Sequence, residues 1–270
     1  MTAETKREDE TESMERPEKS EGPLSGRIAL VTGGSRGLGK AIALAFADAG
    51  ADVAIVSRKL DSCEELAEEV RRTTGRRAVA VAAHVGDWEA LPAMLDDVET
   101  QLGHCDVLVN NAGIAPLYDD LQGVSEQLFD KVIAVNLKGP FRLMALAGAR
   151  MRENGGGSII NISSIASMRP TTSDLPYAAA KAALNTLTAG FAQAFGPTVR
   201  VNTIVAGPFL TDISKAWDHI AFEEAVAAYP LRRGGQPDEI VGAALYFAGP
   251  GSTYTTGAQL AVDGGRTAMP

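Results

Sequence analysis

Cysteine and histidine are scarce in this chain of 270 residues. The two cysteines, Cys63 and Cys105, lie far apart, and His84, His104 and His219 lack the spacings that bring zinc ligands together. Neither a disulfide framework nor a metal site is therefore expected. The charged N-terminus has no apolar core of the kind that a secretory signal needs, so we expect a cytoplasmic protein.

Long apolar runs and an excess of basic residues are missing as well. No stretch approaches the roughly 20 apolar residues of a membrane span, so no membrane association is expected. The net charge of -9 opposes the phosphate attraction behind non-specific nucleic-acid binding, so nucleic acid is not an expected partner. A hydrophobic content of 45% with 22% charged residues is instead typical of a globular protein.

The start of the chain differs in composition from the rest, being rich in acidic and poor in apolar residues. Such a segment buries too little surface to offset the entropy lost on ordering. This predicts a disordered acidic tail over residues 1–22 and a single folded domain over 23–270. A docking role for the tail stays open beside the simpler interpretations of a solvated extension or a start at Met14.

From Arg27 onward, short apolar runs alternate with longer amphipathic stretches. The runs lack polar alternation, which indicates strands buried on both faces, as in a parallel sheet. Strands are predicted at 28–31, 53–56, 79–82, 107–109, 158–162, 199–205 and 259–262, and helices at 38–49, 61–73, 87–102, 125–152, 176–194 and 237–248. This order predicts an α/β, Rossmann-type, doubly wound parallel sheet of about seven strands flanked by helices. The irregular stretch 207–230 follows a late strand, where we expect a mobile substrate lid.

A glycine-rich segment, residues 32–39, joins the first strand to the first helix. Its glycines permit a tight turn and a close approach to a pyrophosphate, and the helix N-terminus offers free N–H groups. A plain tight turn would also need glycine, but the position between a strand and a helix favours a dinucleotide site. The predicted cofactor contacts here are Gly33, Ser35, Arg36, Gly37, Leu38 and Gly39.

The end of the second strand predicts which dinucleotide is preferred. A site selective for NAD places an acidic residue there to bind the ribose 2′-hydroxyl, and this chain has Ser57, Arg58 and Lys59 instead. Arg58, with Arg36 and the Ser57 hydroxyl, could bind a 2′-phosphate. NADP(H) is therefore favoured and NAD(H) stays possible, the alternative being that Arg58 and Lys59 are a solvated pair that opens a helix.

Tyr177 and Lys181 stand four residues apart after Pro176, so they should share one face of a helix. A nearby ammonium favours the phenolate and would bring the pKa of the tyrosine toward neutrality. A strand that ends at Ser164 supplies a hydroxyl that could hold a substrate oxygen while Tyr177 delivers a proton. A packed tyrosine beside a solvated lysine is the alternative for this pair taken alone.

Taken together, these motifs resemble the short-chain dehydrogenase/reductase family over about residues 24–265, in particular its 3-oxoacyl-[acyl-carrier-protein] reductase and gluconate 5-dehydrogenase-like members. The motifs that carry the resemblance are Thr32–Gly39, Asn110–Gly113, Val135–Asn136, Ser164, Tyr177 with Lys181, and Val262–Gly265. The resemblance implies that Tyr177 is the general acid/base and that Ser164 orients the carbonyl. It also implies that Lys181 binds the nicotinamide ribose and lowers the pKa of Tyr177, and that Asn136 holds a water in a proton relay. A purely structural hydrogen bond of Asn136 is the alternative.

The same resemblance assigns further cofactor contacts: Asn111 and Gly113 on the adenosine side, Val85, and Phe209 and Thr211 in the nicotinamide-side loop. Two positions depart from the family pattern. Ala206 stands where a proline is usual, with Pro208 two residues later, which puts the rigidity of this loop in doubt. His84 precedes Val85 where an Asp or Asn is common, which leaves an adenine contact by His84 uncertain.

The expected function is NAD(P)-dependent hydride transfer between a nicotinamide and a carbonyl or secondary alcohol of a small molecule, of sugar-acid or 3-oxoacyl type. The alternatives are a dinucleotide-binding regulator without turnover, and a dehydratase or epimerase. The resemblance also predicts a homotetramer that pairs the 125–152 and 176–194 helices. The small-residue face formed by Ala178, Ala182, Asn185 and Ala189 fits this pairing, and packing on the chain's own sheet explains it equally well.

Overall fold

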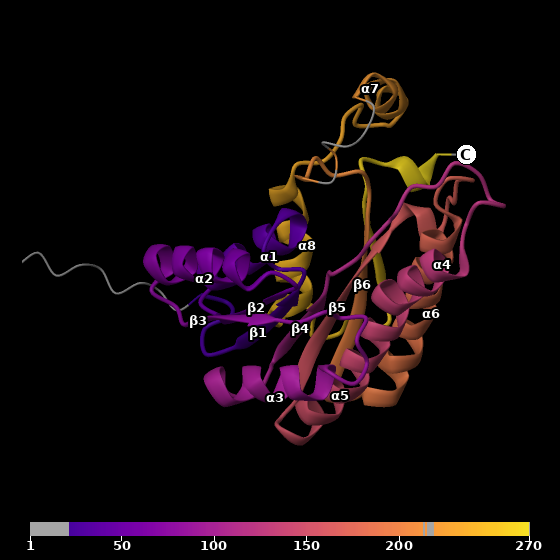
Figure 1. Ribbon diagram of the computed structural model, residues 1–270. Coiled ribbons are helices and arrows are strands. Elements are labelled where there is room, and N and C mark those ends of the chain that lie inside the picture. The colour runs from indigo at the N-terminus through magenta and orange to yellow at the C-terminus, as the bar shows by residue number, and fades with distance from the viewer. Residues whose placement is uncertain (1–21, 213, 215–218, 270) are drawn as a thin grey trace, which may run out of the picture.

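The computed structural model describes residues 22–212, 214 and 219–269. All but one residue of the predicted tail lies outside this part of the chain, as do residues 213 and 215–218 of the predicted lid. As predicted, seven parallel strands form one sheet (Figure 1). Their order is β3-β2-β1-β4-β5-β6-β7. They are β1 (Ile28–Thr32), β2 (Asp52–Ser57), β3 (Ala78–Ala82), β4 (Val107–Asn110), β5 (Gly157–Ser164), β6 (Val199–Ala206) and β7 (Gln259–Val262).

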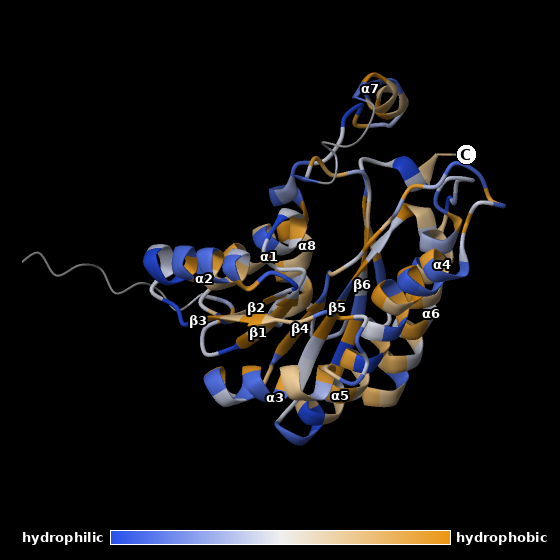
Figure 2. Cartoon of the chain, in the orientation of Figure 1, coloured by the Kyte–Doolittle hydropathy of each residue, from blue (hydrophilic) through white to orange (hydrophobic). Residues whose placement is uncertain are grey.

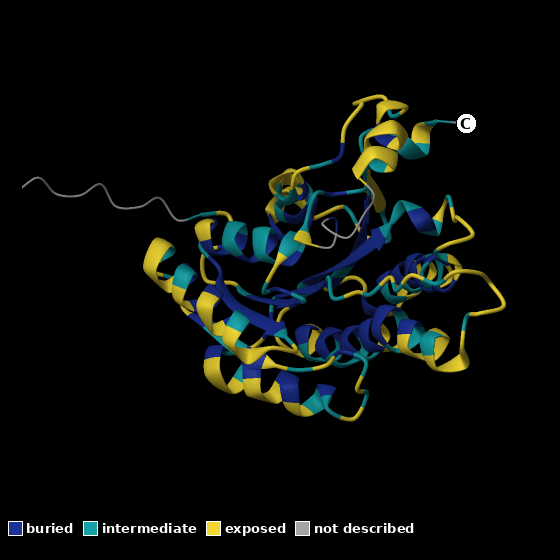
Figure 3. Ribbon diagram, turned by 45° about the horizontal axis from the view of Figure 1, so that its top comes forward, coloured by how far each residue is buried: buried dark blue, intermediate teal, exposed yellow. Residues whose placement is uncertain are grey.

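Two helical layers cover the two faces of the sheet (Figure 1). One layer holds α1 (Gly37–Asp48), α2 (Leu60–Thr74) and α8 (Val241–Ala248), and the other holds α3 (Leu91–Leu102), α5 (Gly139–Glu153) and α6 (Leu175–Phe195). Along β1, Ala29 and Val31 enter the first core while Leu30 between them enters the second. The central strands are buried, as Figure 3 shows, whereas the edge strand β7 is largely exposed. Figure 2 shows polar residues on the outer helices. This arrangement explains apolar strands without alternation.

The strands all run in one direction, so their carboxyl ends meet at one edge of the sheet. Chain order reverses between β1 and β4, which are neighbours in space, and open α/β sheets bind ligands at such a switch point. At the same edge, Ser164 at the end of β5 pairs with Ala206 of β6, which pairs with Val262 of β7. The segments that follow these strands therefore lie side by side.

A π-helical turn interrupts the predicted 125–152 helix. α4 (Glu126–Ile133) passes into this turn (Ala134–Lys138), from which α5 continues. Such turns are frequent at functional sites, and this one holds the fully buried Asn136. Within the described part of the chain, the run Glu126–Glu153 is also the one helical stretch that could cross a membrane by length and composition alone. Half of its 18-residue apolar window is buried inside the protein, and core helices of soluble proteins pass the same test.

A helix stands within the stretch 207–230, which was predicted to be irregular. α7 (His219–Ala227) projects beyond the carboxyl edge of the sheet and is mostly exposed (Figures 1 and 3). Ahead of it, the N–H of Leu210 donates to the carbonyl of Gly235 at 2.8 Å, and the N–H of Gly235 donates to the carbonyl of Pro208 at 3.0 Å. These two hydrogen bonds hold the loop whose rigidity the missing proline at position 206 had put in doubt.

Candidate active site

The glycine-rich loop lies at the switch point, between β1 and α1. Gly33 has a φ of +61° and Gly37 a φ of +55°, a region that favours glycine. A Cβ on Gly39 would lie 2.3 Å from the carbonyl oxygen of Gly33, so only glycine lets the helix begin this close to the loop. The Arg36 side chain makes no capping hydrogen bond at the start of α1, and the first turn of this helix has no acidic residue. The backbone N–H groups at the start of α1 are therefore available to an anion.

The end of β4 braces this loop. The Thr32 hydroxyl donates to the carbonyl of Val109 at 3.1 Å and accepts from the backbone N–H of Asn111 at 3.0 Å. The Nδ2 of Asn111 donates to the carbonyl oxygens of Thr32 at 2.9 Å and Gly33 at 3.1 Å. Asn111 was expected to contact the adenosine side of a cofactor. Its Nδ2 protons are engaged by the glycine-rich loop, so its side chain also braces this site.

Two hydroxyls and two arginines gather where β1 and β2 end. The Ser35 hydroxyl donates to the Ser57 hydroxyl at 3.1 Å, and the following residues, Arg36 and Arg58, are both exposed. Among the residues that the structure describes, neither guanidinium forms an ion pair. Free guanidinium groups beside hydroxyls are suited to binding a phosphate.

The remaining cofactor contacts expected from the sequence reach the same edge in different ways. Val85 follows β3 and is buried, whereas His84 is exposed and accepts a hydrogen bond from the N–H of Gly86 at 3.2 Å. Thr211 lies against the glycine-rich loop, since a Cβ on Gly37 would be 3.4 Å from its side chain.

Phe209 is the expected contact whose side chain is buried. Its side chain is 6% exposed and belongs to the core under α1 and α8, where it packs against Gly235. The ring is therefore turned into the protein, and only the backbone of Phe209 is left to face a ligand. The sequence of this loop, Gly207–Thr211, gives no sign of which way the ring points.

Tyr177 and Lys181 lie on α6 and face the end of β5. Lys181 is 3% exposed, its Nζ donates to the carbonyl of Ile162 at 2.7 Å, and Nζ lies 5.6 Å from the centre of the Tyr177 ring. The alternative of a solvated lysine is therefore excluded. Burial lowers the pKa of Lys181 to about 8, so the ammonium is still mostly charged at neutral pH.

The pKa of Tyr177 moves opposite to the expected direction. Burial raises it above the ordinary value of 10.0, the hydrogen bond with the Ser164 side chain lowers it, and the charge of Asp174 raises it. Lys181 was expected to lower this pKa, but its ammonium lies over the face of the ring. Tyr177 consequently keeps its proton at neutral pH.

Ser164 ends β5 and opens a single 3-10 turn (Ile165–Ser167). Its hydroxyl oxygen accepts the N–H of Ala166 at 3.2 Å, which leaves its own proton to donate. Two residues that the sequence analysis did not place in the site hold this turn. The Ser167 hydroxyl donates to the Ser164 carbonyl at 2.6 Å, and the Nδ2 of Asn185 donates to the Ser167 hydroxyl at 3.0 Å. Asn185 lies one helical turn beyond Lys181, a spacing that could have identified it.

Asn136 uses its amide within the protein. Its Oδ1 accepts from the N–H of Ile114 at 3.1 Å, and its Nδ2 donates to the carbonyls of Ile114 and Val132, each at 2.9 Å. These bonds match the structural alternative, and they leave one Oδ1 lone pair for a water. A Cβ on Gly113 would lie 2.9 Å from this Oδ1 and 3.6 Å from the Nζ of Lys181, so the segment after β4 passes close to both groups.

A buried polar row, also missed in the sequence, ties α6 to the sheet. Asn110 Nδ2 donates to Asn161 Oδ1 at 2.9 Å, and Asn161 Nδ2 donates to the Thr188 hydroxyl at 2.9 Å. The Thr188 hydroxyl in turn lies 2.7 Å from that of Thr203. Asparagines within apolar strands were the available signal, because a buried amide requires partners.

This arrangement fits a dinucleotide. The uncapped start of α1 and the glycine-rich loop suit a pyrophosphate. Ser164, Tyr177 and Lys181 lie at the end of β5, two strands along the same edge of the sheet. Over residues 22–212, 214 and 219–269, no group of three His, Cys, Asp or Glu side chains could hold a metal ion. The fold and the site therefore define a Rossmann-type, dinucleotide-binding class of protein.

Comparison with known proteins narrows this class to one family. The family model described as enoyl-(acyl carrier protein) reductase matches residues 33–267. The chain belongs to the short-chain dehydrogenase/reductase family of oxidoreductases.

Relatives with different substrates resemble the chain to a similar degree. It is 36% identical to the D-threitol dehydrogenase of Mycolicibacterium smegmatis, over 90% of this chain and 94% of the relative. It is also 36% identical to the 3-oxoacyl-[acyl-carrier-protein] reductase of Chlamydia trachomatis, over 90% of this chain and 98% of the relative. A solved structure of a blue fluorescent protein from a metagenomic library, in complex with NADPH, superposes with a TM-score of 0.83 at 36% identity, over 90% of this chain and 98% of that one.

The lowered pKa of Lys181 predicts a pH-dependent stability. The unfolded chain binds a proton at the ordinary lysine pKa of 10.5, whereas the folded chain loses it near 8, so stability rises with pH across this window. From pH 7 to pH 10, the free energy of unfolding of the wild type should rise by roughly 2–3 kcal/mol relative to that of Lys181→Met. Urea denaturation at several pH values measures this free energy. Lys131→Met, which removes an exposed lysine, is the control and should follow the wild type. The prediction would be contradicted if the free energy of unfolding changed with pH equally in Lys181→Met and the wild type.

Proposed function

We propose that this protein is an NADP(H)-dependent oxidoreductase that interconverts a carbonyl and a secondary alcohol on a small molecule. The observation that carries the proposal is the convergence of Ser164, Tyr177 and the buried Lys181 beside a glycine-rich loop. A regulator without turnover would have no need of an ammonium kept in a site where its burial lowers its pKa.

In the proposed mechanism, each side chain acts on the substrate oxygen or supports a group that does. The Ser164 hydroxyl, whose oxygen already accepts the N–H of Ala166, donates its proton in a hydrogen bond to the carbonyl oxygen. Tyr177 gives its proton to the same oxygen as the alcohol forms, and takes it back in the reverse direction. Lys181, held by the Ile162 carbonyl, supplies positive charge beside the phenol. A nicotinamide dinucleotide held by the glycine-rich loop and Lys181 would supply the hydride for the carbonyl carbon, or accept it in the reverse direction.

The preference for the phosphorylated dinucleotide rests on the end of β2. Arg36 and Arg58 are exposed, and among the described residues neither has an ion-pair partner. No carboxylate stands at Ser57, Arg58 or Lys59 to bind a 2′-hydroxyl or repel a phosphate. The NADPH bound to the metagenomic relative supports the same choice.

The proposed substrate is a carbonyl compound of sugar-acid or 3-oxoacyl type. The similarity to a 3-oxoacyl-[acyl-carrier-protein] reductase supports the acyl part of this range, and the similarity to a D-threitol dehydrogenase supports a small polyhydroxylated substrate.

Tyr177→Phe tests the proposed acid/base. General acid–base catalysis contributes about 10²–10⁴-fold, so kcat for an accepted substrate should fall by at least the lower of these factors. The affinity for NADPH, measured by fluorescence titration, should stay within a few-fold of the wild type because only the hydroxyl is removed. Tyr254→Phe, which alters a fully exposed tyrosine, is the control. Turnover by Tyr177→Phe within a few-fold of wild type would refute the role.

Arg58→Asp tests the cofactor preference. Losing a charge-assisted hydrogen bond of roughly 1.5–3 kcal/mol corresponds to a factor of about 10 to 150 in affinity. The Kd for NADPH should therefore rise at least tenfold, while that for NADH is unchanged or improved. Arg72→Asp makes the same charge change at an exposed site on α2 and should leave both values unaltered. If the wild type had a kcat/KM for NADH equal to or higher than that for NADPH, Arg58 and Arg36 would not bind a 2′-phosphate as proposed.

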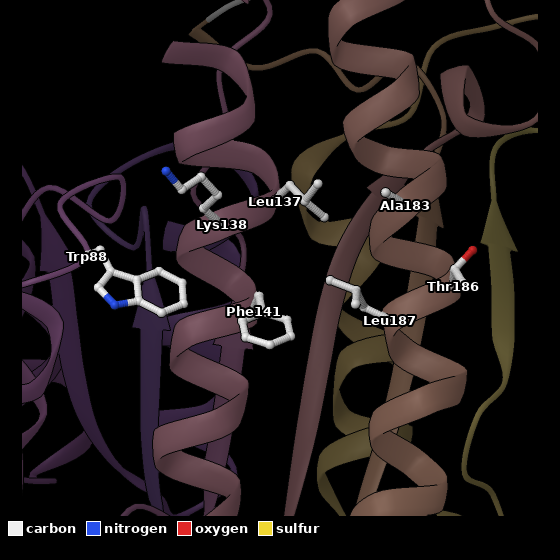
Figure 4. A pocket seen from close by; sticks show the side chains of 7 residues that line it. All are labelled: Trp88, Leu137, Lys138, Phe141, Ala183, Thr186 and Leu187. Carbon is white, nitrogen blue, oxygen red and sulfur yellow. The ribbon is translucent and has the colours of Figure 1, made fainter. Parts of the chain in front are cut away.

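We also propose a homotetramer that pairs the outer faces of α5 and α6. An apolar groove of about 400 Å³ runs between them, lined by Trp88, Leu137, Lys138, Phe141, Ala183, Thr186 and Leu187 (Figure 4). Phe141 is 39% exposed despite stacking on Trp88 at 6.1 Å between ring centres. An aromatic surface of this kind gains stability when a second subunit covers it.

Light scattering tests the assembly. The wild type should have about four times the monomer mass of 28.2 kDa, and Phe141→Glu should lower the mass by placing a charge in the groove. Circular dichroism checks that the variant is folded. A monomer mass for the wild type at micromolar concentration would reject the proposal.

A further inference from the structure

Tyr118 cross-links two loops at the entrance to the candidate site. It lies in the segment after β4, and its hydroxyl donates to the carbonyl of Thr172 at 2.8 Å and accepts from the N–H of Leu175 at 3.0 Å. Leu175 is the first residue of α6, and Asp174 before it makes no capping hydrogen bond with its side chain. Tyr118 therefore caps the helix that carries Tyr177 two residues later. We call these two hydrogen bonds the Tyr118 clasp.

A small cavity lies directly behind the clasp. Tyr118 and Tyr177 both line it, together with Ala115, Pro116, Leu128, Val132, Asp174 and Pro176. Its volume of about 10 Å³ is enough for one water at most. Its lining is mainly apolar, and two of its polar side chains make hydrogen bonds within the protein: the Tyr118 hydroxyl makes the clasp, and the Oδ1 of Asp174 accepts the N–H of Thr171 at 2.8 Å. A chain rich in hydroxyls would find few partners there, and unpaired hydroxyls are costly to bury.

Exposed apolar side chains flank the clasp on both loops. Leu117 is 79% exposed and Leu121 51% exposed in the segment after β4, and Leu175, whose N–H binds Tyr118, is 38% exposed. A single exposed leucine is ordinary, whereas several around one entrance indicate a surface that contacts an apolar ligand. We call these three leucines the apolar rim.

We propose that Tyr118 is a specificity-determining residue, and that the substrate is a carbonyl compound with an extended apolar arm. The arm lies on the apolar rim, and the Tyr118 clasp opens to admit it beside Tyr177. This inference rests on the proposed function and narrows its substrate range: it favours the acyl-like end over compact polyols. In the closed clasp, Tyr118 limits how far the arm can enter.

NADPH oxidation with two ketone series tests the inference. One series is 2-butanone to 2-decanone, and the other is dihydroxyacetone and erythrulose. For the wild type, kcat/KM should rise at least tenfold from 2-butanone to 2-decanone and should be lower for both polyol ketones. Tyr118→Phe keeps the ring and removes the clasp, so it should lower KM for 2-decanone at least threefold with kcat little changed. Tyr254→Phe is the matched control and should change neither value.

The double variant Leu117→Ser with Leu175→Ser tests the apolar rim. It should lower kcat/KM for 2-decanone at least tenfold more than kcat/KM for 2-butanone, and keep the wild-type mass in light scattering. A uniform fall of kcat for every ketone in Tyr118→Phe would mean that the clasp only stabilises α6, and would overturn the inference. The inference would also be overturned if the double variant had a changed mass but kept the wild-type preference for 2-decanone over 2-butanone.

Two further outcomes separate the inference from the proposed function. A wild type that oxidises NADPH with the polyol ketones but with none of the alkanones overturns the inference and leaves the oxidoreductase proposal standing. Oxidation with neither series, by protein shown to bind NADPH by fluorescence, overturns both.

Discussion

A buried ammonium is the constraint that the rest of the candidate site must satisfy. Removing the charge of Lys181 from water is costly, and the described contacts that offset this cost are the Ile162 carbonyl at 2.7 Å and the face of the Tyr177 ring. Ile162 lies on β5 and Tyr177 on α6, so the ammonium is stabilised only while strand and helix keep their relative position. The Ser163 hydroxyl, which donates to the backbone carbonyl of Lys181 at 3.3 Å, adds a second tie between them.

Directional hydrogen bonds fix the position of α6 relative to β5, which apolar packing alone does not fix. The cores on the two faces of the sheet provide most of the driving force for folding, but burial of apolar area is non-directional and tolerates small slips of a helix along a sheet. The row from Asn110 through Asn161 to Thr188 does not tolerate them, since each slip would leave a buried amide or hydroxyl unpaired. Thr32 and Asn111 do the same between β1 and β4, on the side of the glycine-rich loop.

Local patterns in the sequence predicted what depends on neighbours along the chain. The seven strands, the parallel sheet and the glycine-rich loop follow from apolar runs and from glycines at fixed offsets, and the structure confirms them. The π-helical turn at Asn136 was missed because its apolar period hardly differs from that of an α-helix. The inward turn of Phe209, the engaged amide of Asn111 and the Tyr118 clasp depend on partners 26 or more residues away. One sequence carries no signal for such partners.

Two pKa shifts in the candidate site also decide the order in which its protons leave. Burial raises the pKa of Tyr177 above 10.0 and lowers that of Lys181 to about 8. Raising the pH therefore removes the positive charge of Lys181 before it creates a phenolate on Tyr177. At neutral pH the neutral phenol can give a proton to a carbonyl oxygen, whereas it cannot accept one from an alcohol. Because the positive charge is lost first, alkaline pH does not simply prepare the base that alcohol oxidation needs.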